Sequence, residues 1–437
     1  MNFEKICLGD VCTFQEGYVN PSQKISEYFD GPIKWLRAND LNNAFVYETS
    51  RTLSKRGFES AGKSAVLFEP ETLAISKSGT IGRLGILKDH MCGNRAVINI
   101  KPDPNLADPL FVFYALLHDQ HQISTLADGS VQKNLYVSAL SGFEYFTPSL
   151  SDQVRVSRTL ASLDDKIELN RRMNETLEEI SRALFRDWFV DFGPTRRQME
   201  GATDPTAIMG QAFPPQKAAT LAPLFPAKLG EDGLPEGWYK QPVGELAEIV
   251  GGGTPNTKTD EFWEGGTHLW ATPRDLSKLS GVFIGDTERK LTDAGLAKVS
   301  SGLSPKGSVL MSSRAPIGYL AIASQPVAVN QGFIVIRPTD QLPTQFAKLW
   351  CEANMETIEA NANGSTFQEI SKKNFKPILA TVPSADVMTA FSNFAGLLFE
   401  KVQANEQENQ TLAALRDLLL PKLMSGEIRL KDAENAS

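Results

Sequence analysis

The chain has 437 residues, of which 41% are hydrophobic, 22% charged and 9% aromatic. At roughly 100 to 200 residues per domain, this length predicts two to four folding units, and the composition excludes wholesale disorder. Lys and Arg number 44 against 52 Asp and Glu, a net charge of −8, so no global basic field attracts nucleic acid, and any DNA binding must be local or shared with a partner.

The four cysteines, Cys7, Cys12, Cys92 and Cys351, form no Cys-x-x-Cys pair and are too few to cross-link a chain of this length. This usage is typical of a reducing compartment. The N-terminal segment lacks a basic region followed by an apolar one, and no apolar run approaches the roughly 18 residues of a membrane span. We therefore expect a soluble, cytoplasmic protein without membrane contact.

The first half of the sequence recurs in the second half at an offset of 235 to 238 positions. The matching positions include Leu8-Gly9 with Val243-Gly244, Trp35 with Trp270, Ser76 with Ser312, Ile81-Gly82 with Ile317-Gly318, Asn94 with Asn330, and Pro148-Ser149 with Pro383-Ser384. A register kept over this length indicates a duplicated half, and each copy is large enough to bury a core of its own.

Short strands separated by Gly, Pro and Asp turns dominate each copy. They are predicted at Thr72 to Ser76, Arg95 to Ile100, Val309 to Ser312 and Gly332 to Arg337. Helices are predicted from Pro109 to Leu117 and from Pro343 to Trp350, because proline suits a first helical turn. The predicted fold class is α+β (mixed α/β), with each domain followed by a long helix.

The two long helices carry apolar side chains at steps of three and four, and are expected at about Val154 to Phe189 and about Val387 to Leu423. At a rise of about 1.5 Å per residue, each would span roughly 50 Å. Each apolar stripe could cover its own domain, but pairing of the two helices is the favoured interpretation. The predicted pairing residues are Leu163, Ile167, Asn170, Leu177 and Leu184 in the first helix and Leu398, Val402, Asn405, Leu412 and Leu419 in the second.

Asn170 and Asn405 interrupt the two stripes near the middle of each helix. A buried polar pair can fix the register of paired helices at some cost in stability. Parallel and antiparallel pairing would both bring these two residues level, so the spacing leaves the direction open.

The predicted boundaries follow from these elements and from a stretch rich in Pro, Ala and Gly that reads as a linker. They are a first domain at 1–152, a central helix at 153–192, the linker at 193–237, a second domain at 238–385, a C-terminal helix at 386–425 and a tail at 426–437.

The segment from Gly57 to Ser64 matches the Walker A pattern of nucleotide-binding P-loops. A P-loop needs a buried strand before it and a helix after it. Here a helix start is predicted before it, at Ser50 to Arg56, and a strand after it, at Ala65 to Phe68. The counterpart at Gly295 to Gly302 also lacks the Gly-Lys-Ser ending. A P-loop ATPase is therefore the less favoured alternative.

No catalytic constellation is present in the sequence. His118 and His121 lie three residues apart on a predicted helix, but nothing completes a metal site. A nucleophile elbow, a dinucleotide-binding turn and an Asn-Pro-Pro-aromatic motif for adenine methylation are all missing. We therefore expect a non-catalytic chain without a metal.

Polar loops after the strands recur in both copies and combine cations, amides, hydroxyls and glycines. Arg, Asn and Gln can make bidentate contacts with guanine or adenine, and Lys and Arg contact phosphate. The alternative is that these loops only end strands, as we expect of Ile81-Gly82 and Ile317-Gly318. The candidate DNA-binding residues are Lys77, Ser78, Thr80, Arg83, Arg95, Gln132 and Lys133 in the first copy and Arg314, Asn330, Gln331, Thr366 and Gln368 in the second.

Taken together, these features resemble the specificity (S) subunit of Type I restriction-modification systems over nearly the whole chain. The features that carry the resemblance are the twofold domain-and-helix arrangement, the Ser-x-x-x-x-Ile-Gly loops, the turn from Gly364 to Ile370, the Leu-Pro-Glu-Gly-Trp at Leu234 to Trp238 and the ending from Leu418 to Arg429. The first copy departs from this pattern, since it lacks the Pro-Glu-Gly-Trp entry and has Gly-Ser-Val-Gln-Lys from Gly129.

The resemblance implies two target-recognition domains, each reading one half of a bipartite double-stranded DNA target, held apart by an antiparallel coiled coil that sets the spacer. It implies two methyltransferase (M) subunits and two restriction/translocase (R) subunits as partners, with S-adenosylmethionine, ATP and Mg expected on those partners and no cofactor on this chain. Exposed helix residues such as Arg171-Arg172 and Glu178-Glu179 are candidates for docking M subunits, although a solvated face is an equal alternative. A coiled-coil adaptor that binds protein without base readout remains the other alternative.

Overall fold

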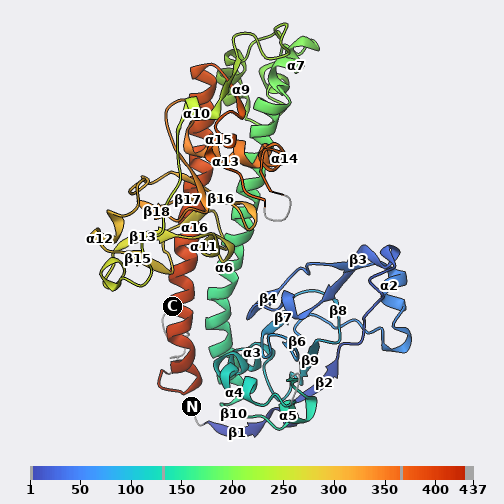
Figure 1. The fold of residues 1–437 in the computed structure, drawn as a ribbon. Helices are drawn as coiled ribbons and strands as arrows, with labels where there is room; N and C mark the ends of the chain where they lie inside the picture. The colour runs from blue at the N-terminus through green and yellow to red at the C-terminus, as the bar shows by residue number, and fades with distance from the viewer. Residues whose placement is uncertain (1–2, 130–132, 365–367, 429–437) are drawn as a thin grey trace, which may run out of the picture. The chain divides into compact units, whose positions relative to one another are not determined.

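The computed structural model describes residues 3–129, 133–364 and 368–428. The chain forms two compact units, the first from Met1–Leu169 with Glu408–Ser437 and the second from Asn170–Gln407. Each unit contains one α/β domain and part of both long helices, α6 (Leu150–Phe185) and α16 (Ala385–Met424) (Figure 1).

The first unit contains sheets of two, three and five strands, covered by short helices. Its strands are β1 (Glu4–Cys7), β2 (Cys12–Glu16), β3 (Phe29–Leu36), β4 (Ala44–Val46), β5 (Thr52–Leu53), β6 (Leu73–Ser76), β7 (Leu84–Leu87), β8 (Met91–Gly93), β9 (Val97–Pro102) and β10 (Glu144–Thr147). Its short helices are α1 (Leu8–Val11), α2 (Lys55–Glu59), α3 (Pro109–His118), α4 (Gln120–Thr125) and α5 (Val137–Ser141).

The second unit contains the same three kinds of sheet. Its strands are β11 (Tyr239–Pro242), β12 (Glu248–Val250), β13 (His268–Ala271), β14 (Phe283–Ile284), β15 (Arg289–Leu291), β16 (Val309–Ser313), β17 (Ile317–Ala323), β18 (Val327–Val329), β19 (Phe333–Arg337) and β20 (Leu379–Val382). Its short helices are α7 (Gly193–Met199), α8 (Pro205–Ile208), α9 (Pro215–Leu221), α10 (Val243–Leu246), α11 (Pro273–Ser277), α12 (Asp293–Leu296), α13 (Thr344–Ala353), α14 (Met355–Ala360) and α15 (Lys372–Phe375).

The strand order is identical in the two units. The five-stranded sheet runs β2-β9-β6-β7-β4 in the first and β12-β19-β16-β17-β14 in the second, and the three-stranded sheets run β5-β3-β8 and β15-β13-β18. In both three-stranded sheets the last pair is parallel and the first pair antiparallel. The duplication and the mixed α/β class predicted from the sequence are therefore confirmed.

Successive side chains of the central strands point to opposite faces of the first unit's five-stranded sheet, so that each face has an apolar core of its own. Leu73 and Ile75 of β6 pack in the cluster that contains the apolar face of α3, whereas Ala74 between them joins the cluster on the opposite face. This period of two places helix α3 over one face of the sheet. The other face lies toward β3 and β8, and the loop after β8 is one of the polar loops described below.

The four predicted strands are confirmed as β6, β9, β16 and β19, and the two predicted short helices as α3 and α13. Helix α3 begins as expected, with Pro109 in its first turn and the Asp108 Oδ1 accepting the Phe111 N–H at 2.9 Å. Helix α13 differs, because Pro343 occupies its N-cap and Thr344 is the first helical residue.

The long helices α6 and α16 run antiparallel in the first unit. The Arg416 Nη1 lies 2.6 Å from the Asp164 Oδ1, and the Lys166 Nζ lies 3.3 Å from the Glu408 Oε2. A later residue of α6 thus faces an earlier residue of α16. Helix pairing, which the sequence favoured over packing of each helix on its own domain alone, is confirmed.

The second unit has the same antiparallel pairing but not the predicted asparagine pair. The Asn405 Nδ2 donates to the Asn174 Oδ1 at 2.7 Å, and the ring of Phe185 lies 5.9 Å from that of Phe391. Asn405 thus bonds to Asn174, one helical turn along α6 from Asn170, which was predicted to lie level with it. Periodicity along a helix does not fix which of two asparagines on adjacent turns faces the partner helix.

The stretch from 193 to 237, expected to be a linker, is folded onto the second unit. Pro194, Pro205 and Pro215 each stand in the first turn of a short helix, α7, α8 and α9 respectively. The side chains of Phe213 and Phe225 are buried against Trp188. The prolines that indicated a connection thus start helices, because their fixed φ suits a first helical turn.

Candidate nucleic-acid interface

The loop between β6 and β7 in the first unit is closed by the hydroxyl of Ser76. The Ser76 Oγ donates to the carbonyl oxygen of Thr80 at 2.5 Å and accepts the backbone N–H of Arg83 at 2.9 Å. Gly82 stands within this turn with a φ of 86°, a value that favours glycine. The polar residues of the loop are therefore presented by a closed turn.

The loop between β16 and β17 in the second unit repeats this arrangement. The Ser312 Oγ donates to the carbonyl oxygen of Pro316 and accepts the N–H of Tyr319, both at 2.8 Å. Gly318 has a φ of 100°. The serine and glycine of the repeated Ser-x-x-x-x-Ile-Gly pattern thus shape the turn, which leaves the residues between them to vary.

Three loops that the sequence singled out separately meet at one place in each unit. In the first unit, the Lys77 N–H donates to the carbonyl oxygen of Ala96 at 2.8 Å, and the Lys77 carbonyl oxygen accepts the N–H of Leu135 at 2.9 Å. In the second unit, the same two bonds, of 2.8 and 3.0 Å, join Ser313 to Gly332 and Ile370. Each domain therefore gathers the candidate residues that the structure describes into one cluster of three loops. We call it the loop cluster, which is joined through Lys77, Ala96 and Leu135 in the first unit and through Ser313, Gly332 and Ile370 in the second.

Two of the candidate cations are paired with carboxylates of their own domain. The Lys77 Nζ lies 2.6 Å from the Glu16 Oε2, with side chains only 19% and 24% exposed, and the Arg314 Nη1 lies 3.6 Å from the Glu369 Oε2. Their charge is partly neutralised within the domain. These two residues are thus less available to phosphate than their sequence position indicated.

The remaining candidates differ in exposure. In the first unit, Thr80, Arg95 and Lys133 are exposed and Ser78 and Arg83 are half-buried, while in the second Gln331 and Gln368 are exposed and Asn330 is half-buried. Gln132 and Thr366 lie outside the described residues. Among the residues that the structure describes, no carboxylate lies within ion-pair distance of Arg83, Arg95 or Lys133.

Sequence reasoning missed the segment that packs against the back of each loop cluster. A Cβ added at Gly17 would lie 2.2 Å from the carbonyl oxygen of Asn94, and one added at Gly252 would lie 2.5 Å from that of Asn330. Only glycine allows this approach. The offset of 235 that relates these two glycines was the signal that could have found them.

Arginines stacked on aromatic rings are a second feature that sequence reasoning missed. The Arg51 guanidinium lies 3.9 Å from the ring centroid of Phe29 in the first unit, and that of Arg289 lies 3.5 Å from the ring of Trp263 in the second. Both pairs lie at the three-stranded sheet of their unit. Such stacking holds a guanidinium in place while its edge remains able to donate hydrogen bonds.

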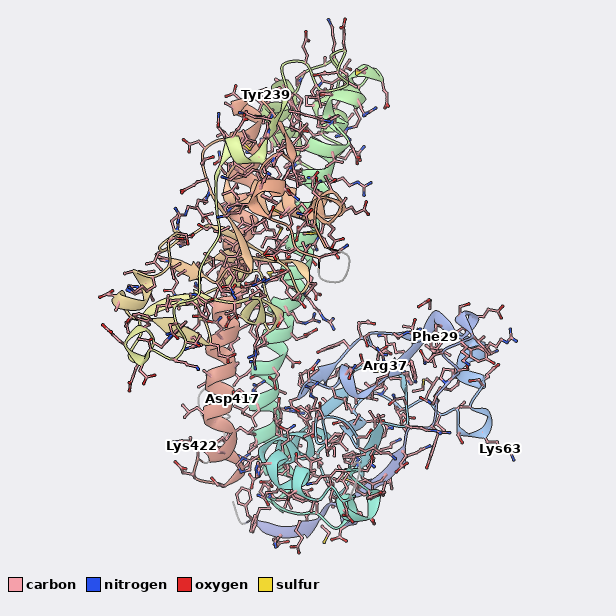
Figure 2. The ribbon with its side chains drawn as sticks, in the orientation of Figure 1. Phe29, Arg37, Lys63, Tyr239, Asp417 and Lys422 are labelled. Atoms are coloured by element: carbon pink, nitrogen blue, oxygen red, sulfur yellow. The ribbon has the colours of Figure 1, made fainter. Side chains whose placement is uncertain are left out.

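The segment that matches Walker A has no P-loop geometry. Its first residues, from Gly57, belong to helix α2, where the Ser54 Oγ accepts the Gly57 N–H at 3.1 Å. Its last residues, Gly62–Ser64, form only a single 3₁₀ turn. The strand predicted after it is wrong, because Phe68 makes no more than an isolated bridge to Met91. Figure 2 shows Lys63 at the outer edge of its domain, where its side chain is exposed.

His118 and His121 do not share one helix, since α3 ends at His118 and α4 begins at Gln120. No group of three or more His, Cys, Asp or Glu in the described ranges could hold a metal ion. No helix in those ranges is long and apolar enough to cross a membrane.

The comparison with known families decides what these paired loop clusters belong to. The family described as the Type I restriction modification DNA specificity domain matches residues 1–179 and 235–388, one stretch in each repeat. The chain belongs to this family. The resemblance stated from the sequence is therefore confirmed, and the chain is a DNA specificity subunit of the Type I restriction-modification kind.

Individual relatives agree with this assignment. The HindI specificity subunit of Haemophilus influenzae is 29% identical over 368 residues, which cover 75% of this chain and 79% of that protein. The MjaIX specificity subunit of Methanocaldococcus jannaschii is 23% identical over 427 residues, covering 95% and 91%. The crystal structure of the Type I restriction-modification S subunit from M. genitalium covers 97% of this chain and 96% of its own, with 17% identity and a TM-score of 0.56, so the fold is shared.

The predicted helix-pairing residues of the specificity subunit all lie on α6 or α16 and none of them is exposed. Leu184, Val402, Asn170 and Asn405 are buried, and Leu163, Ile167, Leu177, Leu398, Leu412 and Leu419 are half-buried. Of the residues considered for docking a partner, Glu178 instead pairs with Lys348 of its own domain at 3.4 Å, and Arg171 pairs with Glu175 on the same helix.

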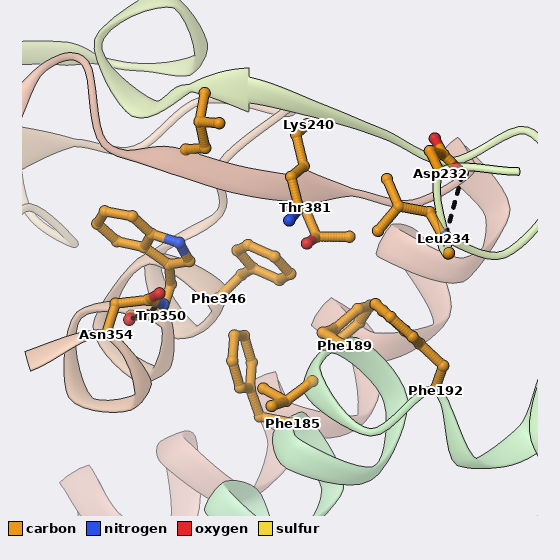
Figure 3. A pocket seen from close by; sticks show the side chains of 13 residues that line it. Phe185, Phe189, Phe192, Asp232, Leu234, Lys240, Phe346, Trp350, Asn354 and Thr381 are labelled. Atoms are coloured by element: carbon orange, nitrogen blue, oxygen red, sulfur yellow. Dashed lines mark hydrogen bonds between the residues drawn. The ribbon is translucent and has the colours of Figure 1, made fainter. Parts of the chain in front are cut away.

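A cavity of about 330 Å³ in the second unit opens where α6 ends (Figure 3). Phe185 and Phe189 of the α6 end, Phe346 and Trp350 of α13, and the strand residue Lys240 line it. The first unit has an equivalent cavity of about 390 Å³, lined by Phe3, Ala115, His118, Asp119, Phe146, Met424 and Ser425. The two cavities are equivalent because most of these residues lie 235 positions from a residue in or next to the lining of the other cavity, as Met424 does from Phe189. Because the cavity recurs in both units with different lining side chains, we attribute it to the way a long helix ends against each domain. The residues that line it form no catalytic group.

Proposed function

We propose that this specificity subunit reads a bipartite double-stranded DNA target, with each target-recognition domain reading one half through its loop cluster. The observation that carries the proposal is that the DNA specificity family matches both repeats, each of which brings the same three loops together. Loops at strand ends can enter a groove and present Arg, Lys, Gln and Thr side chains to phosphates and base edges. The chain itself contributes recognition and no catalysis.

The long helices set the spacing between the two half-sites in this proposal. Helices α6 and α16 each contribute residues to both units, so their paired length relates the two recognition domains. Two surfaces that approach one face of B-DNA sit about one helical turn, roughly 34 Å, apart. The bases between the half-sites would then be spanned and not read.

Two M subunits and two R subunits complete the proposed complex, which acts in the cytoplasm. The M subunits would bind S-adenosylmethionine and methylate adenine, and the R subunits would bind ATP and Mg. The net charge of −8 supports a shared DNA interface, because a chain of this sign gains little from the phosphate field alone. The M subunits would supply much of the phosphate contact.

The test is to co-express the chain with its M subunit and to map adenine methylation across a genome at single-base resolution. We expect a motif of two specified halves separated by unspecified bases, which disappears when the chain is omitted. Methylation that is absent, or that is the same without the chain, would refute the proposal. The double variant Arg95→Ala with Gln331→Ala provides a second check, because it should relax the motif while leaving assembly with the M subunit intact.

A further inference from the structure

The two loop clusters contain one turn with the same backbone and a different displayed side chain. After β8, the Ala96 N–H donates to the Asn94 Oδ1 at 3.0 Å, and after β18 the Gly332 N–H donates to the Asn330 Oδ1 at 2.8 Å. The residue between the two bonded positions is exposed in both cases. It is Arg95 in the first unit and Gln331 in the second.

The surroundings fix this turn independently of the displayed residue. The Asn94 N–H donates to the carbonyl oxygen of Leu36, and the Asn330 N–H donates to that of Ala271, both at 3.0 Å. The glycine segment behind each turn and the backbone bonds of the loop cluster hold it from the other sides. Because none of these contacts uses the side chain at position 95 or 331, that residue can change without altering the turn.

The two displayed side chains match different base edges. The Arg95 guanidinium only donates hydrogen bonds, and guanine presents two acceptors, O6 and N7, in the major groove. The Gln331 amide both donates and accepts, and adenine presents the N6 donor and the N7 acceptor. The Thr254 Oγ1 donates to the Gln331 Oε1 at 2.5 Å, which orients this amide and leaves its second lone pair available.

The neighbouring loops also differ in charge between the two clusters, as Arg95 and Gln331 do. Arg83 and Lys133, on the other two loops of the first cluster, correspond to Tyr319 and Gln368 in the second. The second unit instead has cations on α15, where the Lys372 Nζ lies 3.3 Å from the Cβ position of Gly251. Cations that can contact phosphate are thus present in both units, but only the first displays a cation at the tip of the shared turn.

We propose that Arg95 and Gln331 are equivalent specificity-determining residues, through which the first domain reads a guanine and the second domain reads an adenine. This proposal rests on the proposed function and names the base class that each loop cluster takes. Both residues are positioned by backbone bonds, so the base identity at one position of each half-site follows from one side chain.

Reciprocal exchange in the complex with the M subunit tests the proposal. Arg95→Gln should change or relax one guanine position in one half of the methylated motif, with discrimination falling about tenfold or more, while the other half stays unchanged. Gln331→Arg should move one adenine position of the other half toward guanine. Genome-wide mapping of adenine methylation reads out both halves in one experiment, and co-purification with the M subunit shows that each variant is folded.

Lys133→Gln is the matched control, because it removes the same charge from an adjacent loop of the first cluster. It should lower methylation at all sites alike and leave the motif intact. An unchanged motif in the Arg95→Gln complex, an altered motif in the Lys133→Gln complex, or changes from both exchange variants in the same half would each overturn the assignment. A wild-type complex that shows no bipartite motif would instead refute the proposed function, and this assignment with it.

Discussion

The two units share one strand order but fasten their domains to the long helices by different chemistry. In the first unit, the Tyr114 hydroxyl of α3 donates to the Asp164 Oδ2 at 2.6 Å, and the Arg416 Nη1 of α16 lies 2.6 Å from the Asp164 Oδ1. The corresponding positions in the second unit are Leu349, Phe399 and Ser181. Leu349 and Phe399 are buried in the apolar core of the second unit, and the Ser181 hydroxyl donates to the carbonyl oxygen of Leu177 on its own helix, so the polar link between domain and helices is absent at these three positions.

The second unit has its own buried charges at other positions. Lys348 is 3% exposed, and its Nζ lies 2.8 Å from the Glu352 Oε1 and 3.4 Å from the Glu178 Oε2. The Glu406 carboxylate of α16 accepts the N–H groups of Val282 and Phe283 at 2.7 and 3.1 Å. A duplicated fold thus keeps its topology while each copy acquires separate polar contacts, which teaches that the helix attachment is specific to each domain.

The largest expected effect on stability comes from the residues buried at the C-terminal ends of the two long helices, Trp188 after α6 and Leu423 in α16. Trp188 is buried among Phe189, Phe213 and Phe225 in the second unit, whereas its counterpart Leu423 is buried in the first. Trp188→Ala should lower the free energy of unfolding of the second unit by about 4 kcal/mol, and Leu423→Ala that of the first by about 3 kcal/mol. Urea unfolding followed by hydrogen exchange would assign each loss to its unit.

Trp188→Phe is the matched control for the aromatic cluster. The Trp188 Nε1 is buried without a hydrogen-bond partner among the described residues, so removing that N–H costs no hydrogen bond and the phenyl ring keeps most contacts. We expect a loss of less than about 1.5 kcal/mol. A loss as large as that of Trp188→Ala would show that the ring size, and not aromatic burial, dominates.

A smaller effect separates the two charge networks. Asp164→Asn removes the buried carboxylate that the Tyr114 hydroxyl and the half-buried Arg416 both contact, and it leaves Arg416 paired with the exposed Asp417. We expect it to destabilise the first unit by about 3 kcal/mol. Glu178→Gln should cost the second unit about 1 kcal/mol or less, because Lys348 keeps Glu352. Equal losses in chemical denaturation of the two variants would contradict the view that the exposed Asp417 compensates less for the lost partner than the more buried Glu352 does.

The third prediction uses pH to isolate Glu406 in the second unit. Burial raises the pKa of its carboxyl above the ordinary value of 4.5, although the two backbone N–H donors oppose this. A folded-state pKa above the unfolded value means that the stability contribution is full below about pH 4.5 and is lost as pH rises through the folded-state pKa. The advantage of the wild type over Glu406→Gln should therefore shrink with rising pH in parallel unfolding curves, and a constant difference would refute this.

The sequence allowed the architecture to be predicted because the duplication and the helical periodicity are both local or repeated signals. It did not allow the attachment of Glu406 to be predicted, since Glu406 lies 124 positions from Val282 and occupies the space that a side chain at Gly281 would need. The folding of residues 193–237 was missed because proline is compatible with both a linker and a helix start.

In the loop clusters too, the sequence predicted where the residues lie but not which other residues they contact. The repeated spacing located the loops, but Lys77 and Arg314 are paired with Glu16 and Glu369, which no spacing rule connects to them. Asn330 was a candidate for base contact, whereas its Oδ1 accepts a backbone N–H that shapes the turn. Residue type therefore identified the right region, and only the folded environment distinguishes residues that build the turn from those displayed by it.

The smallest expected effect concerns a sequence motif, the Gly-Lys-Ser ending, that is present in one copy only. Lys63 ends the Walker A match, yet it stands exposed on a single 3₁₀ turn with no helix start to bind phosphate, and the second copy lacks its equivalent. Lys63→Ala should leave both the methylated motif and the unfolding free energy unchanged to within about 0.5 kcal/mol. Calorimetric titration of ATP into the purified chain should show no binding for either form. Binding that Lys63→Ala abolishes would instead make this loop a nucleotide site specific to the first domain, and the two copies would then differ in function as well as in their attachment to the helices.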